Sequence, residues 1–185
     1  MEIYLIRHTS PEIEKGVCYG HSDIPLKATF LMESEQVLNA IPKYFDKVYS
    51  SPLQRCKQLA LVISEDITVD HRLKELNFGS WELKKWTDIP YNEIQFWYDD
   101  WVNASTHQGE SYQDLQHRAV SFIKDIPCHY NSVAIVTHSG VIRSLWAYFN
   151  NIALKKSFHS LVIGYGDVVK IILDAKGNPK LNLKK

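Results

Sequence analysis

Leu5-Ile6-Arg7-His8-Thr9 near the start of the chain and Ala134-Ile135-Val136-Thr137-His138-Ser139-Gly140 near its end share one pattern. Each is a short apolar run that stops on a histidine beside a small residue, which predicts a strand rather than a helix. Strands that end this way direct their last side chains from the carboxyl edge of a parallel sheet, where open α/β folds bind ligands. We therefore expect two imidazoles and an arginine to meet at one sheet edge.

The rest of the chain alternates between predicted strands and helices. Strands are expected at residues 3–7, 47–50, 67–69 and 132–137, with a less regular pair at 160–164 and 168–173. Apolar residues at three-to-four spacing predict helices at residues 26–45, 52–64, 112–126 and 141–149. This alternation predicts a three-layer α/β/α sandwich with a mainly parallel sheet. A hairpin turn predicted at Gly164-Tyr165-Gly166-Asp167 allows the last strand to run antiparallel.

The composition restricts the class of protein and of partner. The 185 residues are 45% hydrophobic and contain no Pro/Gly/Ser-rich linker, which predicts a single domain over residues 1–185. Basic and acidic residues both total 21, so no overall field favours nucleic acid or a membrane surface, and a small anionic substrate is expected. No apolar run reaches transmembrane length. Three cysteines without zinc-site spacing, and no signal peptide, predict a cytoplasmic protein.

Ser51-Pro52-Leu53-Gln54 predicts where the second helix begins. The serine and glutamine have the spacing of a capping box, and the proline suits the first helical position. Arg55 then lies in the first turn, where free backbone N–H groups and the helix dipole favour an anion. An arginine there adds a bidentate clamp for oxyanions, although a solvated surface arginine is the simpler interpretation.

Residues 75–109 are rich in tryptophan and have weak periodicity, which predicts an insertion of short helix and loop above the sheet edge. Aromatic side chains are more often core than ligand contacts, so we expect two of the following to line a pocket: Tyr19, Trp81, Trp86, Trp97 and Trp101. Arg143 follows His138 by five residues on a predicted helix. It suits an ion-pair partner as well as it suits a substrate contact.

Five motifs follow one another along the chain: Arg7-His8-Thr9, residues 50–56, residues 72–82, Gly109-Glu110-Ser111 and His138-Ser139-Gly140. In this order and approximate spacing they resemble the histidine phosphatase superfamily, also called phosphoglycerate mutase-like, over about residues 3–146. Residues 16–26 are most similar to the alpha-ribazole phosphatases, which remove the 5′-phosphate of a nucleoside-like precursor during cobalamin assembly. The resemblance implies a phosphomonoesterase that needs no metal or other cofactor.

The resemblance also implies roles for individual residues. The catalytic set is His8 as phosphorylated nucleophile, Arg7 and Arg55 as phosphate clamp, His138 as second histidine of the phosphate pocket, and Glu75 as general acid and base. Substrate contacts are expected from Thr9, Tyr19, Gly20 and Ser139. Thr9 and Ser139 replace the glycines usual in the superfamily, but both are small enough to admit a phosphate.

Phosphoryl transfer explains why these residue types are needed. Catalysis consists largely of positioning and of stabilising charge on the phosphoryl oxygens, which Arg7, Arg55 and a proton-bearing His138 would supply. His8 must be neutral at its attacking nitrogen, which requires the other ring nitrogen to donate to an acceptor such as a backbone carbonyl. Glu75 would protonate the departing alkoxide and then activate water.

Several alternatives stay open from the sequence. Glu82 and Glu110 are rival acids, although a solvated charge and a helix-start residue are their simpler interpretations. A mutase would return the phosphoryl group to its substrate, but the chain lacks the asparagine that mutases place shortly after the first histidine. A non-catalytic phospholigand-binding protein would use the same pocket, but His8 and Glu75 are both present. The expected substrate is alpha-ribazole 5′-phosphate, and the oligomeric state is not predicted.

Overall fold

A computed structural model describes residues 1–174, 177 and 179. In this part of the chain five strands form one sheet in the order β3-β2-β4-β1-β5. Their bounds are β1 (Glu2–Arg7), β2 (Lys47–Ser50), β3 (Ile67–Val69), β4 (Ser132–Thr137) and β5 (Val168–Ile172). β1 to β4 pair in parallel, and β5 runs antiparallel to β1. The prediction of a mainly parallel sheet is confirmed, and the last strand is the antiparallel one.

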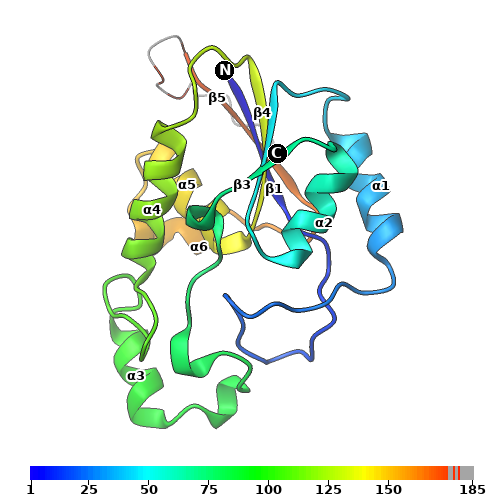
Figure 1. Ribbon diagram of the computed structural model, residues 1–185. Coiled ribbons are helices and arrows are strands. Elements are labelled where there is room, and N and C mark those ends of the chain that lie inside the picture. Colours follow the sequence, from blue (N-terminus) through cyan, green and yellow to red (C-terminus); the bar gives the residue numbers. More distant parts are fainter. Residues whose placement is uncertain (175–176, 178, 180–185) are drawn as a thin grey trace.

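Helices cover both faces of this sheet (Figure 1). Their bounds are α1 (Phe30–Ala40), α2 (Gln54–Ile63), α3 (Tyr91–Asp99), α4 (Tyr112–Lys124), α5 (Ser139–Phe149) and α6 (Ser157–Ser160). One core cluster joins α1 and α2 to the sheet, and a second joins α4 and α5 to its opposite face. The predicted three-layer sandwich is therefore confirmed. None of the helices within the described residues is long and apolar enough to cross a membrane.

The alternation of side chains along β1 ties the two layers together. Ile3 and Leu5 belong to the cluster beneath α4 and α5, whereas Tyr4 and Ile6 belong to the cluster beneath α1 and α2. All four are buried. A central strand covered on both faces has no solvent side, which explains why its sequence reads as a continuous apolar run.

The first helix is shorter than the predicted span of residues 26–45. Before it, Leu26 forms a bridge with Pro11 and the main-chain N–H of Lys27 donates to the Ser10 carbonyl, so this backbone belongs to the loop after β1. After it, Pro42 disfavours a helical conformation at Ile41, which is extended.

The strand predicted at residues 160–164 is wrong. α6 ends at Ser160, and the residues after it form no strand. Their carbonyls accept hydrogen bonds from arginine side chains: Leu161 from Arg143 Nε and Ile163 from Arg7 Nη1. The turn at residues 164–167 is present, with Gly166 at φ +73°. It delivers β5 to the edge of β1 rather than joining two strands of a hairpin.

Residues 75–109 form the predicted insertion of short helix and loop. It contains 3₁₀ turns at Gly79–Trp81 and Trp86–Asp88 and the helix α3. Figure 1 places it beyond the carboxyl end of β1. A small core cluster packs Trp81 and Ile89 of the insertion against Cys18 of the loop after β1. It is therefore positioned to build a wall over the sheet edge.

Candidate active site

The parallel pairing of β1 with β4 brings two histidines together at the carboxyl edge of the sheet. Arg7 lies opposite Thr137, so the next residues, His8 and His138, leave their strands side by side. The main-chain N–H of His8 donates to the Thr137 carbonyl at 3.0 Å. The two imidazole centroids are 5.1 Å apart, and both side chains are buried. Two histidines far apart in sequence thus share one small volume.

Both imidazoles are held neutral. His8 Nδ1 lies 2.7 Å from the Thr9 carbonyl, and since a carbonyl only accepts, the proton is on Nδ1 and the Nε2 lone pair is free. Burial first, and then the charge of Arg55, lowers the pKa of His8 well below its usual value. The same two causes lower the pKa of His138. Both histidines are therefore favoured in their neutral form, and His8 presents a free Nε2 lone pair.

Ser51 serves His138 rather than the helix that follows, so the predicted capping box is wrong. Its Oγ lies 2.8 Å from His138 Nε2. The helix α2 begins at Gln54 instead of Pro52, with Leu53 as an N-cap residue that makes no side-chain cap. A hydroxyl that was expected to satisfy a helix end instead orients the second histidine.

Arg7 and Arg55 are held by backbone carbonyls, and the buried Nε–H of each has no partner. Arg55 is fully buried and donates from Nη1 to the Ser22 carbonyl at 2.7 Å and from Nη2 to the Gly20 carbonyl at 2.6 Å. Arg7 donates from Nη1 to the Ile163 carbonyl at 2.9 Å. The Nε–H of each is buried without a partner. Buried donors are normally satisfied, so these two indicate an anion that both arginines would share.

Glu75 is fixed to the start of α5 and lines the same pocket as His8. Its Oε2 accepts from the Gly140 N–H at 3.0 Å and from the Ser139 hydroxyl at 3.3 Å. Its Oε1 accepts from the Leu76 N–H at 3.0 Å. A Cβ on Gly140 would lie 2.2 Å from Glu75 Oε1, so this approach requires glycine. The carboxylate thus has a fixed position in the pocket that His8 also lines.

Glu82 is not the solvated charge expected from the sequence. Its carboxylate accepts five hydrogen bonds, from the N–H groups of Gly20, His21, Ser22 and Phe78 and from the Ser22 hydroxyl. These hydrogen bonds outweigh burial and lower the pKa of Glu82. The loop that Glu82 holds supplies the two carbonyls that hold Arg55. Glu82 is thus a positioning residue, a role that the sequence analysis did not predict because its partners in residues 20–22 lie about 60 residues away.

Glu110 is engaged elsewhere. It accepts from Arg118 Nη2 at 2.6 Å and Nε at 3.0 Å and from the Asn77 N–H at 2.8 Å. The helix that follows is capped by Ser111 and Asp114 instead. Arg118 pairs with this carboxylate, and of the two residues only Glu75 lines the pocket beside His8.

A pocket of about 250 Å³ opens next to His8 and is walled mainly by aromatic rings. The aromatic residues that line it are Tyr19, Phe78, Trp86, Trp97, Trp101, Tyr112 and Phe158. Four of the five aromatic candidates line it, so the expectation of two was too low. Trp81 is the exception, since it is buried in the small core cluster with Cys18 and Ile89.

Arg143 also lines this pocket and has no carboxylate within 4.0 Å among the residues described. Its Nε donates to the Leu161 carbonyl at 3.2 Å, and its guanidinium lies 4.7 Å from the centre of the Phe158 ring. Arg72 and Arg118, by contrast, form ion pairs with carboxylates. The ion-pair interpretation of Arg143 is therefore wrong, and its charge faces the pocket.

The four expected substrate contacts separate into three kinds. Tyr19 and Ser139 line the pocket. Thr9 is fully buried, and its hydroxyl has no partner. Gly20 directs its N–H to Glu82 and its carbonyl to Arg55, and a Cβ there would lie 1.8 Å from the Leu76 carbonyl. Gly20 thus supports the arginine instead of facing the pocket.

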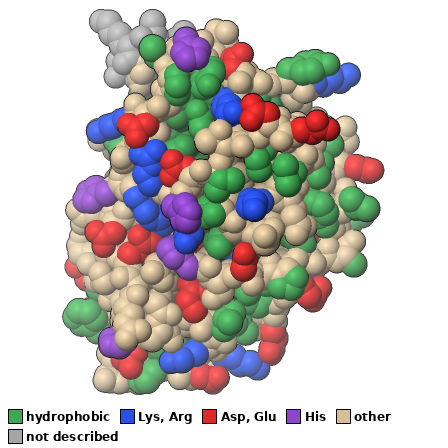
Figure 2. Space-filling view, in the orientation of Figure 1, with side chains coloured by type: hydrophobic (Ala, Val, Ile, Leu, Met, Phe, Trp, Pro, Cys, Tyr) green, Lys and Arg blue, Asp and Glu red, His purple; other side chains and the backbone are tan. Residues whose placement is uncertain are grey.

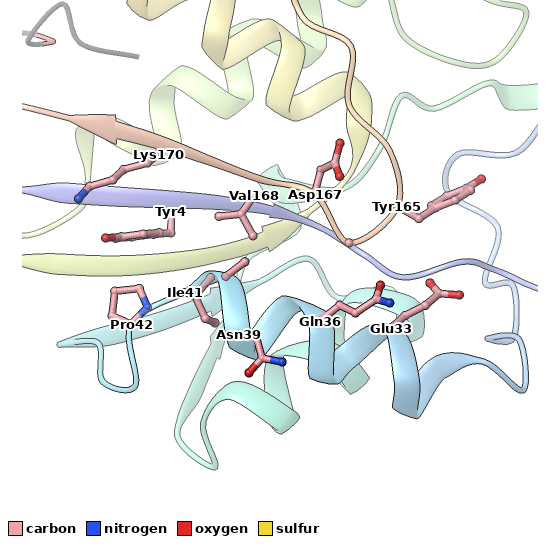
Figure 3. A pocket seen from close by; sticks show the side chains of 12 residues that line it. Tyr4, Glu33, Gln36, Asn39, Ile41, Pro42, Tyr165, Asp167, Val168 and Lys170 are labelled. Carbon is pink, nitrogen blue, oxygen red and sulfur yellow. The ribbon is translucent and has the colours of Figure 1, made fainter. Parts of the chain in front are cut away.

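A larger groove of about 620 Å³ lies between α1 and β5 (Figure 3). Its charged groups are already partnered: Glu33 accepts from the Ser10 N–H, Asp167 from the Gly164 N–H, and Lys170 pairs with Glu2. The unpartnered buried Nε–H groups of Arg7 and Arg55 belong to the first site and not to this groove.

Acidic and basic side chains are interspersed on the face shown in Figure 2. Within the described part of the chain, no group of three or more His, Cys, Asp or Glu side chains is placed to hold a metal ion.

A family model, curated relatives and solved structures all relate this chain to phosphatases. The family model of the histidine phosphatase superfamily (branch 1) matches residues 3–183. A Hydrogenobacter thermophilus protein provisionally named phosphoserine phosphatase 2 is 30% identical over 163 residues, 83% of this chain and 80% of that protein. The adenosylcobalamin/alpha-ribazole phosphatase of Escherichia coli K12 is 28% identical over 171 residues, 86% and 84% of the two chains. The crystal structure of the Shigella flexneri alpha-ribazole phosphatase superposes with a TM-score of 0.89 at 25% identity, covering 99% and 95%.

Glu82→Gln should weaken binding of inorganic phosphate and lower kcat/KM by at least about 10-fold. Complete loss of one donor to an oxyanion lowers kcat by roughly a hundred-fold or more, and misplacing Arg55 should cost a part of that. The amide offers one acceptor where the carboxylate serves five donors, so the carbonyls that aim Arg55 lose their anchor. Phosphate inhibition constants and urea unfolding curves would measure both effects. Glu35→Gln, an exposed change on α1, is the control. A loss of stability with unchanged phosphate affinity would contradict the positioning role.

Acidification should destabilise the fold through the two buried histidines. Their pKa values are lowered in the folded protein, so below about pH 6.5 the unfolded chain binds protons that the folded chain does not. Each histidine should then remove up to about 1.4 kcal/mol of unfolding free energy per pH unit as the pH falls. The unfolding free energy, measured by urea denaturation at several pH values between 7.5 and 5.5, should fall less steeply with pH for His138→Asn than for the unsubstituted protein. Parallel curves would show that His138 protonates equally in both states.

Proposed function

Because this chain belongs to the histidine phosphatase superfamily and is a phosphatase, we propose that it hydrolyses a small phosphate monoester through a phosphohistidine at His8. One observation carries this proposal. The free Nε2 of a buried neutral histidine lies among two arginines whose buried Nε–H groups have no partner. We also propose that the protein acts in the cytoplasm, which its free cysteines Cys18, Cys56 and Cys128 support.

In the first half-reaction, His8 Nε2 attacks phosphorus while the bond from phosphorus to the ester oxygen breaks. The departing oxygen takes its proton from the Glu75 carboxyl, which the start of α5 holds beside the pocket. The Nδ1–H bond to the Thr9 carbonyl keeps the ring in its reactive tautomer and stabilises the positive charge that develops on it. Arg7, Arg55 and His138 stabilise the phosphoryl oxygens.

In the second half-reaction, the Glu75 carboxylate takes a proton from water as the water oxygen attacks phosphorus. The bond from phosphorus to His8 Nε2 breaks, inorganic phosphate forms, and the histidine returns to its neutral state. The same carboxyl group therefore acts first as an acid and then as a base. No metal ion is required in this scheme, because guanidinium and imidazole groups supply the positive charge.

We propose alpha-ribazole 5′-phosphate as the substrate. Its flat base and ribose suit a pocket of about 250 Å³ with aromatic walls, since such rings stack favourably on Trp86, Trp97 or Trp101. The Escherichia coli relative is named for this activity. A small ester of this kind is more compatible with a pocket of about 250 Å³ than a nucleic acid would be.

Arg143 favours a second candidate, an ester whose alcohol carries a carboxylate, such as phosphoserine. Its guanidinium lines the pocket with no acidic partner among the described side chains, and arginine binds carboxylates in bidentate fashion. The Hydrogenobacter relative has a phosphoserine phosphatase name. The two candidates differ in whether aromatic stacking or charge pairing dominates recognition of the alcohol.

Glu75→Gln should accumulate phosphorylated His8 when the substrate is p-nitrophenyl phosphate. An acidic phenol leaves without a proton, so phosphorylation proceeds, whereas hydrolysis of phosphohistidine still needs the missing base. Rapid quench with labelled substrate followed by peptide mapping should place an acid-labile, base-stable label on the His8 peptide. Glu110→Gln should show no such accumulation. Label on another residue would overturn the proposed nucleophile, and accumulation only in Glu110→Gln would reassign the acid.

A substrate panel distinguishes the two candidates. Under the main proposal, kcat/KM for alpha-ribazole 5′-phosphate exceeds that for phosphoserine and 3-phosphoglycerate. Arg143→Met should lower kcat/KM for the two carboxylate substrates by about 10- to 100-fold, the effect of losing a charged hydrogen bond, and affect the nucleoside ester less. Higher efficiency on phosphoserine would favour the second candidate. Phosphoryl transfer between phosphoglycerates with a bisphosphoglycerate primer would favour a mutase.

A further inference from the structure

Two tyrosines from distant segments of the chain lie against Arg7 and Arg55, the proposed phosphate-binding arginines. The hydroxyls of Tyr19 and Tyr165 lie 2.8 Å apart, and the residues are separated by 146 positions in sequence. The Tyr165 ring centre lies 3.9 Å from the guanidinium carbon of Arg7. The Tyr19 ring centre lies 5.3 Å from that of Arg55. One hydrogen bond therefore links two rings that each cover one arginine.

The backbone next to Tyr165 also forms hydrogen bonds with Arg7 and His8. The Arg7 N–H donates to the Asp167 carbonyl at 3.0 Å, and the Gly166 N–H donates to the His8 carbonyl at 3.2 Å. The carbonyl of Ile163 accepts from Arg7 Nη1. These bonds set the Tyr165 ring against both Arg7 and the His8 imidazole, whose centroid is 5.5 Å away. Figure 3 shows the Tyr165 hydroxyl pointing away from the other residues of the groove.

Core packing does not explain this arrangement. Tyr165 is 41% exposed and contributes little buried area. Its ring covers one face of the Arg7 guanidinium, and a carbonyl occupies Nη1, so the Nε–H that remains free has a fixed direction. Burial raises the pKa of Tyr19, so its hydroxyl stays protonated and keeps the bond to Tyr165. The contacts of the pair are with the groups that would meet a phosphate.

We propose that Tyr19 and Tyr165 are a positioning pair that holds Arg7 and Arg55 in their phosphate-binding orientation through the shared hydroxyl bond. This inference rests on the proposed phosphate site. The rings restrict the two guanidiniums before the substrate arrives, so less ordering is needed when phosphate binds. Neither tyrosine takes part in the proton transfers, which remain with Glu75.

The test is a double-mutant cycle with orthophosphate and orthovanadate as the probes. Tyr19→Phe and Tyr165→Phe each keep the ring and remove the bond, so each should weaken binding of both probes by about 3- to 10-fold. The double variant should bind no more weakly than the weaker single variant, because either change already breaks the shared bond. Tyr165→Leu also removes the ring from Arg7 and should weaken binding further. Tyr148→Phe, a similarly exposed tyrosine on α5, is the control.

Urea unfolding of the same variants separates positioning from stability. The phenylalanine variants should unfold near the unsubstituted protein while their probe affinities fall. Unchanged affinity in both single variants, or losses that add in the double variant, would overturn the pairing proposal while the phosphate site stands. Failure of the unsubstituted protein to bind either probe would overturn the proposed function itself.

Discussion

The register between β1 and β4 is the constraint on which the site depends. Arg7 faces Thr137 because Ile3 and Leu5 must enter one core cluster while Tyr4 and Ile6 enter the other. A slip by one residue would exchange the two faces of the strand and expose its apolar side chains to the wrong layer. Core packing therefore fixes a backbone position at which His8 and His138 lie side by side. The chemistry needs no local motif to bring the histidines together.

Around this pair the structure separates two kinds of arginine. Arg72 and Arg118 lie against carboxylates, whereas Arg7, Arg55 and Arg143 have none within 4.0 Å in the described chain. Backbone carbonyls hold those three in place without neutralising them. Positive charge is thus retained beside two neutral imidazoles, and a phosphate dianion would relieve the electrostatic imbalance. The Glu75 carboxylate accepts from backbone N–H groups and not from these arginines. It can therefore lie in the same pocket and leave the arginine Nε–H groups free for an anion.

The sequence predicts those parts of the molecule that follow from near neighbours in the chain. The strands at residues 47–50, 67–69 and 132–137 were predicted with the bounds observed, because short apolar runs between turn signals depend on local periodicity. The role of Ser51 was not predicted, because its partner His138 lies 87 residues away and competes with the helix end. The roles of Glu82 and Tyr165 were missed for the same reason, since the partners that determine their positions come from distant loops. Only the resemblance to a family indicated His8, Arg55 and Glu75 together.

The two ends of the substrate would meet different parts of the fold. In the proposed complex the phosphate end would meet β1, β4, α2 and their loops, whose positions the sheet determines. The alcohol end would meet the insertion and α6, where tryptophans and Phe158 form the walls. Glu75 lies at the junction, but its carboxylate is anchored to α5 rather than to the insertion. Changes in the aromatic walls can therefore alter which alcohol fits without displacing Glu75, His8 or the arginines. The sheet edge therefore determines the phosphate chemistry, whereas the aromatic walls determine which alcohol is accepted.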